Sequence, residues 1–120
     1  MTQNKVNLAQ KLSLLDERWS PKVVGELNGQ YVKLVKLLGG VVWHHDEKDE
    51  LFLMVKGQFG MEYPDRSEWI EEGEFVVVPR GVEHRPVAEE ETHVTLFEPA
   101  TTVNTGSAGG GMTVAELDRI

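Results

Sequence analysis

Short runs of β-forming residues, separated by turns rich in glycine and proline, occupy most of this 120-residue sequence. Turn signals recur about every 8 to 12 residues, a spacing typical of all-β barrels and sandwiches. The sharpest signal is Asn28-Gly29, because both residues tolerate the positive φ angles of a two-residue type I′ hairpin. We therefore expect strands over 22–27 and 30–38. A sheet of roughly eight such strands must close on itself or pack on a second sheet to cover its edges.

Further runs predict more strands, and both ends of the chain predict short helices. The strand segments are 50–56, 59–63, 68–70, 75–78 and 93–97. Leucines spaced three and four apart after Asn7 predict a helix over 8–15, and Thr113 with Glu116 predicts a capped second helix. We also expect Gly39-Gly40 to end the second strand, 75–78 to be buried, and the glutamates at 89–91 to form a solvated turn.

Composition narrows the class of protein. The length suits one core, and we divide the chain into an N-terminal arm with a short helix (1–20), a β-barrel (21–100) and a flexible C-terminal tail (101–120). A formal net charge of -8 without a Lys/Arg cluster argues against nucleic acid as a partner. No signal peptide or membrane-length apolar run is present, so we expect a cytoplasmic protein that binds no membrane.

The histidines supply the candidate functional residues. The chain has no cysteine, so any metal must be bound by imidazole and carboxylate groups. His44 and His45 follow one β-type run, and His84 follows another across a turn that contains proline and glycine. Glu50 opens an apolar strand, where a carboxylate is costly unless a cation compensates it. We single out these four residues as candidate metal ligands.

Two spacings in this region carry a family resemblance. The pattern G-x(5)-P-x-G-x(2)-H-x(3)-N is followed by Gly73, Pro79, Gly81 and His84, with Ala88 at the Asn place. The pattern G-x(5)-H-x-H-x(3,4)-E-x(6)-G is followed by Glu50 and Gly57, with Gly39-Gly40 and Trp43 of the expected types before the histidines. These are the two motifs of the cupin superfamily, which residues 30 to 100 resemble. The run from Pro79 to Pro86, together with 96–99 and 104–106, resembles a subgroup of short bacterial cupins often labelled mannose-6-phosphate isomerase-like.

The resemblance implies an antiparallel jelly-roll β-barrel, paired as a homodimer, with a divalent metal such as Fe, Mn, Ni or Zn. The first motif departs from the family pattern because His44 and His45 are adjacent and Asp46 follows. A four-residue gap before the glutamate gives the ligand set His45, Glu50 and His84. A three-residue gap gives His44, Asp46, Glu50 and His84. A bulge that turns His44 and His45 toward one ion is a third possibility, since neighbouring strand residues otherwise face opposite sides.

Other residues have two interpretations. His93 matches no ligand position, and it is either a general acid or base that points into the barrel or an ordinary strand histidine. Several bulky side chains alternate along the predicted strands and are expected to fill the barrel or line a pocket. They are Phe52, Met54, Phe59, Met61, Phe75, Val77 and Phe97.

The favoured function is a metal-dependent isomerase or oxygenase that acts on a small polar or carbonyl-bearing metabolite. One alternative is a non-enzymatic small-ligand-binding or sensor barrel whose metal is absent or structural. Another is an interaction module that dimerises through its N-terminal arm, where Trp19 and Tyr31 are aromatic interface candidates.

Overall fold

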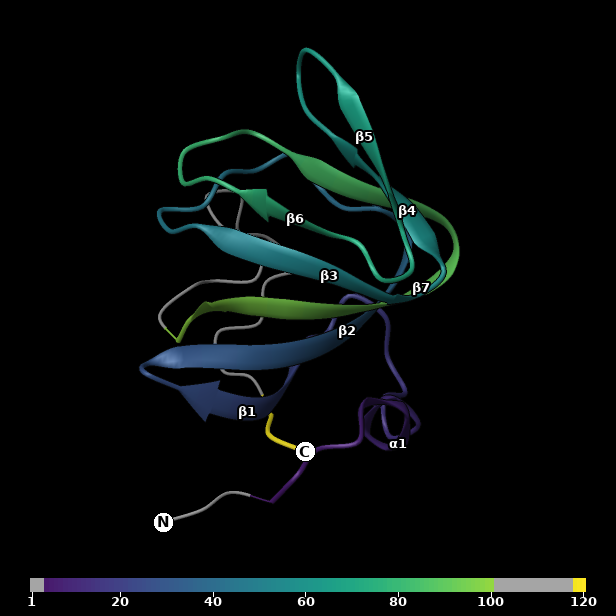
Figure 1. Ribbon diagram of the computed structural model, residues 1–120. Helices are drawn as coiled ribbons and strands as arrows, with labels where there is room; N and C mark the ends of the chain where they lie inside the picture. The colour runs from purple at the N-terminus through teal and green to yellow at the C-terminus, as the bar shows by residue number, and fades with distance from the viewer. Residues whose placement is uncertain (1–3, 101–117) are drawn as a thin grey trace.

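The computed structural model describes residues 4–100 and 118–120, which form one short helix and seven strands (Figure 1). The elements are α1 (Leu8–Leu12), β1 (Lys22–Leu27), β2 (Gln30–Gly40), β3 (Glu50–Lys56), β4 (Gln58–Glu62), β5 (Ser67–Glu71), β6 (Phe75–Val78) and β7 (Arg85–Pro99). The predicted helix at Thr113 begins outside these residues. In the part of the chain that the structure describes, no helix is long and apolar enough to cross a membrane.

The strands form an antiparallel jelly-roll barrel, which confirms the predicted fold class. Five of them are adjacent in the order β1-β2-β7-β3-β6, and β4 pairs with both β5 and β7. The long strand β7 connects the two parts of the sheet. Its second half lies between β2 and β3, whereas its first residues pair with β4 (Figure 1).

The hairpin between β1 and β2 has the predicted turn. Asn28 and Gly29 have φ angles of 50° and 75°, and Leu27 pairs with Gln30 across them. Positive φ at both central residues is what a type I′ turn requires. The twist of this turn matches the twist of the strands that it joins.

The barrel interior contains the main hydrophobic core. Side chains from alternate positions of β3 and β4 fill it, including Phe52, Met54, Phe59 and Met61. Residues between these positions face outward, as the pleat of a strand requires. A smaller cluster lies on the outer face of the sheet, where Leu12 of α1 packs near Leu34 of β2.

Several expectations about single elements were wrong. Strand β6 exists but is only partly buried. Val78 lies in the core, whereas Phe75 and Val77 are 60% and 46% exposed, because they lie on the outer face of an edge strand that pairs only with β3. Strand β2 does end at the glycine pair, but its last residue is Gly40, two residues later than predicted, and its register shifts after Leu37.

The glutamates at 89–91 lie within β7 and not in a turn. Ala88 pairs with Gly39 and Thr92 pairs with Leu37, so three glutamates lie opposite one β2 residue in a bulge that is larger than the usual two-to-one type. Helix α1 ends at Leu12, and Leu14 beyond it is exposed.

Candidate metal centre

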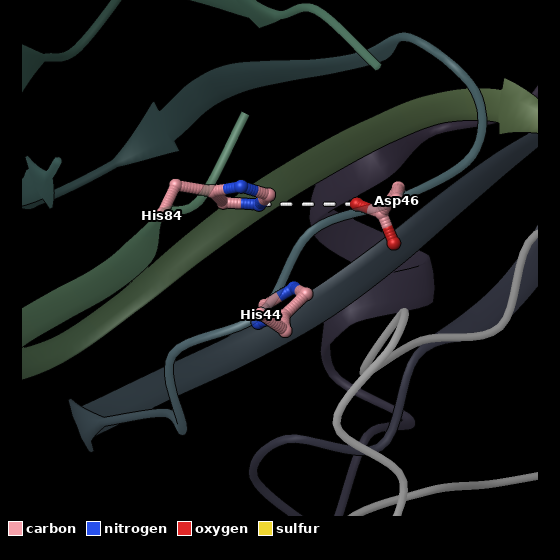
Figure 2. A group of neighbouring side chains, drawn as sticks. All are labelled: His44, Asp46 and His84. Carbon is pink, nitrogen blue, oxygen red and sulfur yellow. Dashed lines mark ion pairs between the residues drawn. The ribbon is translucent and has the colours of Figure 1, made fainter. Parts of the chain in front are cut away.

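Two segments that are far apart in the chain meet at His44 and His84. The backbone N–H of each residue donates to the carbonyl of the other, at 3.1 Å and 2.9 Å. Residues that face each other in an antiparallel pair direct their side chains to the same side. The two imidazole centroids therefore lie 4.5 Å apart inside the barrel (Figure 2).

Both imidazoles are held by the same local hydrogen bond. Nδ1 of His44 lies 2.9 Å from the Val42 carbonyl, and Nδ1 of His84 lies 2.8 Å from the Val82 carbonyl. A carbonyl oxygen only accepts, so each Nδ1 carries the proton and donates it. In the neutral rings, each Nε2 then has a free lone pair, which is the form in which histidine binds metals.

Asp46 reaches the same space because it lies two residues after His44. The backbone pairing continues there, since Gly81 N–H donates to the Asp46 carbonyl at 2.8 Å. His44, Asp46 and His84 each offer one ligand atom, and these atoms all lie within 4.8 Å of one another. Figure 2 shows the Asp46 carboxylate facing His84, with Oδ2 at 3.8 Å from Nε2.

Glu50, the first residue of β3, lies beside this group. Its Oε1 is 3.9 Å from His84 Nε2. His44, Asp46, Glu50 and His84 all have 4% or less of their surface exposed. The structure thus brings together the residues that a three-residue gap in the first motif would select.

The unpartnered polar atoms in this group fit a cation. Both carboxylate oxygens of Asp46 and Nε2 of His84 are buried and have no hydrogen-bond partner among the described residues. Such groups are costly to bury unless something compensates them. Two imidazole nitrogens with carboxylate oxygens are suitable ligands for Fe, Mn, Ni or Zn.

Burial also changes how these groups bind protons. It raises the pKa of Asp46 to about 6, against the partial opposition of nearby His44. Burial raises the pKa of Glu50 well above its usual value, and the neighbouring carboxylate of Glu98 adds to this effect. Burial lowers the pKa of the His84 imidazole. In each case the low-dielectric interior disfavours the charged form.

Lys33 and Glu98 form a buried ion pair that the sequence reasoning missed. Both side chains are inaccessible to solvent, and the Lys33 ammonium donates to Glu98 Oε1. The sequence does contain a sign of this pair, because strand alternation places Lys33 on the same face as the core residues Val35 and Leu37. Charged residues at inward-facing strand positions are rare unless they are paired.

The other two candidate histidines lie elsewhere. His45 lies outside the group, as expected for the residue next to His44 in extended backbone, and its Nδ1 lies 3.2 Å from Glu83 Oε1. His93 is on β7 between the inward-facing positions, near α1, and its Nε2 lies 3.1 Å from Glu91 Oε1. The structure does not bring either ring to His44 and His84.

A small cavity of about 40 Å³ adjoins the candidate ligands. His44 and Glu50 form part of its wall, together with two prolines. The rest is apolar or aromatic and consists of Trp19, Val35, Leu37, Val41, Phe52 and Leu96. A molecule bound here would contact both the candidate metal ligands and this apolar wall.

Solved structures with similar folds support this description of the barrel. A cupin-2 domain protein from Shewanella frigidimarina is 39% identical, with a TM-score of 0.77, over 78% of this chain and 93% of its own. The protein NMB1881 from Neisseria meningitidis is 36% identical, with a TM-score of 0.74, over 81% of this chain and 100% of its own. A hydroquinone 1,2-dioxygenase in complex with Fe3+ shares the fold at 17% identity, with a TM-score of 0.70, over 79% of this chain and 32% of its own.

The comparison by sequence leads to the same family. The uncharacterized protein YdbB of Bacillus subtilis is 28% identical over 64 residues, which are 52% of this chain and 57% of YdbB. The match thus spans less than two thirds of that curated relative. The family model of the cupin domain matches residues 36–99, more than half of the chain. The chain therefore belongs to the cupin domain family.

Proposed function

We propose that this cupin binds one divalent metal through His44, Asp46 and His84, with Glu50 as a fourth ligand, and acts on a small molecule beside it. The observation that carries the proposal is a set of buried polar atoms that have no partner among the described residues, namely Asp46 Oδ1 and Oδ2 and His84 Nε2. One ligand atom from each of His44, Asp46 and His84 lies within 4.8 Å of the other two. The Fe3+ in the dioxygenase of similar fold supports Fe as one candidate. Mn, Ni and Zn suit the same ligands.

The reaction classes that this site suits are isomerisation and oxygenation. When bound, the metal would polarise a carbonyl oxygen of the substrate or bind an oxygen species at an open position. The carbonyls of Val42 and Val82 hold the two imidazoles in the ligating form. Glu50 lines the cavity, so its carboxylate would lie beside a bound molecule, and burial raises its pKa. The Glu50 oxygen that is not bound to the metal is therefore our candidate for the group that accepts and returns a proton, in place of His93.

We also propose that two copies of the chain pair through the outer face of the sheet. The family resemblance implies a homodimer, and this face offers an apolar surface. Residues paired across four strands form one outward row there, consisting of Val32, Phe97, Leu51 and Val77. Phe75 lies on the same face of β6 and is 60% exposed. An exposed aromatic next to an apolar row is typical of an interface.

Metal analysis tests the proposed function. Protein prepared without an affinity tag is incubated with Fe(II), Mn(II), Ni(II) or Zn(II), desalted and analysed for bound metal. We expect about one metal per chain in the wild type and a loss of stoichiometric metal in His84→Ala and Glu50→Ala. His93→Ala is the control, because it removes a histidine from the outer face.

Turnover then separates the candidate functions. Metal content that is unchanged in His84→Ala would refute the metal site. Metal that is bound and lost as expected, without isomerase or oxygenase activity on carbonyl compounds, would favour the non-enzymatic ligand-binding alternative.

A further inference from the structure

Trp19 forms one wall of the cavity beside the candidate metal ligands. Its backbone N–H donates to the Lys36 carbonyl at 2.8 Å, and its indole Nε1–H donates to the Leu38 carbonyl at 2.7 Å. Trp19 is thus attached to β2 on both sides of Leu37, whose side chain lines the same cavity. Lys36 Nζ also donates to the Leu15 carbonyl at 2.8 Å, which holds the preceding part of the segment on the strand. These bonds make the indole a fixed wall.

The backbone at Trp19 is strained. Its φ angle is 63°, in the left-handed region that bulky residues rarely adopt. Such a conformation is unfavourable for a bulky residue and persists only where the surrounding structure imposes it. Glycine at this position would relieve the strain and remove the indole from the cavity at the same time.

The cavity is chemically simple. Apart from His44 and Glu50, its described lining is apolar, and the one polar atom of Trp19 already donates to Leu38. These lining residues include no lysine, arginine, serine or threonine, which are the side chains that would bind a phosphate or a set of hydroxyl groups. Polar substrate groups other than the one that reaches the metal would lose their hydrogen bonds to water without replacement.

The size of the cavity limits the substrate as well. The cavity measures about 40 Å³, whereas benzene occupies engineered cavities of about 150 Å³. The space beside the indole is therefore too small for an aromatic ring while Trp19 is in place.

We propose that Trp19 determines substrate specificity: the site accepts a metal-binding oxygen group on a short apolar body and excludes aromatic and polyhydroxylated bodies. This inference rests on the proposed metal site and narrows the substrate class. It favours a small carbonyl compound with an aliphatic chain over a sugar phosphate.

Hydroxamic acids test the inference, because they share one chelating group and differ only in the attached body. The wild-type protein is loaded with Co(II), and binding is followed by the visible spectrum. The probes are acetohydroxamic, isobutyrohydroxamic, benzohydroxamic and glycolohydroxamic acid. We expect isobutyrohydroxamic acid to bind about tenfold more tightly than acetohydroxamic acid, because it buries two more carbon groups. The benzo and glycolo compounds are expected to bind no more tightly than the aceto compound.

Substitution of Trp19 should reverse this order. In Trp19→Gly we expect benzohydroxamic acid to bind at least tenfold more tightly than in the wild type and to become the tightest ligand. Leu37→Ala should shift the preference in the same direction and serves as a second variant if Trp19→Gly folds poorly. Trp69→Ala is the matched control, because Trp69 is an exposed indole on β5 that does not line this cavity.

Three results would overturn the inference. They are tight binding of benzohydroxamic acid by the wild type, equal binding of the glycolo and isobutyro compounds, and an unchanged order in both Trp19→Gly and Leu37→Ala. A wild-type protein without Co(II) bands would instead refute the proposed metal site. The cavity is then tested in metal-free protein by the methyl NMR signals of Val35, Leu37 and Leu96. Isobutanol should shift them, whereas benzyl alcohol and glycerol should not, and any other pattern contradicts the inference.

Discussion

The buried position of the Asp46 carboxylate suits a metal ligand but lowers the stability of the metal-free protein. Its oxygens are buried without hydrogen-bond partners in the described part of the chain, and burial raises its pKa to about 6. Asp46 therefore binds a proton more tightly in the folded state than in the unfolded state, where its pKa is near 3.8. Without metal, the free energy of unfolding falls as the pH rises from about 4 through 6. A bound cation reverses this effect, because it binds the ionised carboxylate.

We predict that Asp46→Asn stabilises the metal-free protein and weakens metal binding. At pH 7 the free energy of unfolding in urea with EDTA should rise by roughly 1–3 kcal/mol, since a buried charge is removed. Metal affinity, measured by titration, should fall by at least about tenfold. Asp65→Asn is the control, because Asp65 is an exposed carboxylate in a turn. A metal-free Asp46→Asn protein that is less stable than the wild type would contradict this account.

Protonation of the carboxylates should set a lower pH limit of metal binding. Burial raises the pKa of Asp46 to about 6 and raises that of Glu50 well above its usual value, so protons compete with a metal for these groups on mild acidification. We predict that metal affinity in the wild type declines below about pH 6, as protons compete for Asp46. Titrations between pH 5 and 8 measure this. An affinity that stays constant down to pH 5 would count against Asp46 as a ligand.

The sequence could narrow the ligands to a few sets but could not choose among them. The correct ligand set depends on which residue after Trp43 faces the barrel interior. The reciprocal backbone hydrogen bonds between His44 and His84 decide this orientation, and they join segments that are distant in the chain. No local pattern predicts this register. Once it is known, strand alternation places Asp46 inside and His45 outside.

At the scale of elements, β2 and β7 are joined inside the barrel by the Lys33–Glu98 ion pair. Both residues are buried, and Glu98 lies beside the candidate ligand Glu50. Removing one partner of a buried pair leaves an uncompensated charge, whereas removing both often costs little. The pair therefore links the stability of the barrel to the charge of the site.

We predict that Lys33→Met destabilises the metal-free protein by roughly 3–5 kcal/mol. The double variant Lys33→Met/Glu98→Leu should recover most of that loss, because no charge remains unpaired. Urea unfolding followed by circular dichroism measures both. If the double variant were as unstable as the single one, packing at Lys33, and not its charge, would explain the loss.

Strand positions were predictable where turn residues mark them, and burial was less so. Asn28-Gly29 fixed the first hairpin, and β3 and β6 have the predicted bounds. The exposure of β6 depends on its place at the edge of the sheet, which its apolar sequence does not reveal. The bulge at residues 89–91 likewise depends on pairing with β2, because only the partner strand shows that three residues face one.

For the whole molecule, we predict a homodimer that uses the outer face of β6. Light scattering at micromolar concentration should give twice the 13.5 kDa mass of one chain. Phe75→Glu should produce a monomer, because it places a charge in the apolar face. Trp69→Glu is the control, since Trp69 is an exposed aromatic on β5. A monomeric wild type, or a dimer that is unaffected by Phe75→Glu, would contradict the proposed interface.

The most direct test of the metal centre is a crystal structure of the metal-loaded protein with anomalous data collected at the absorption edge of the metal. The account predicts one strong anomalous peak per chain, within about 2.0–2.2 Å of Nε2 of His44 and His84 and of a carboxylate oxygen of Asp46. A peak at His45, or the absence of a peak between His44 and His84 in protein loaded with equimolar metal, would contradict it.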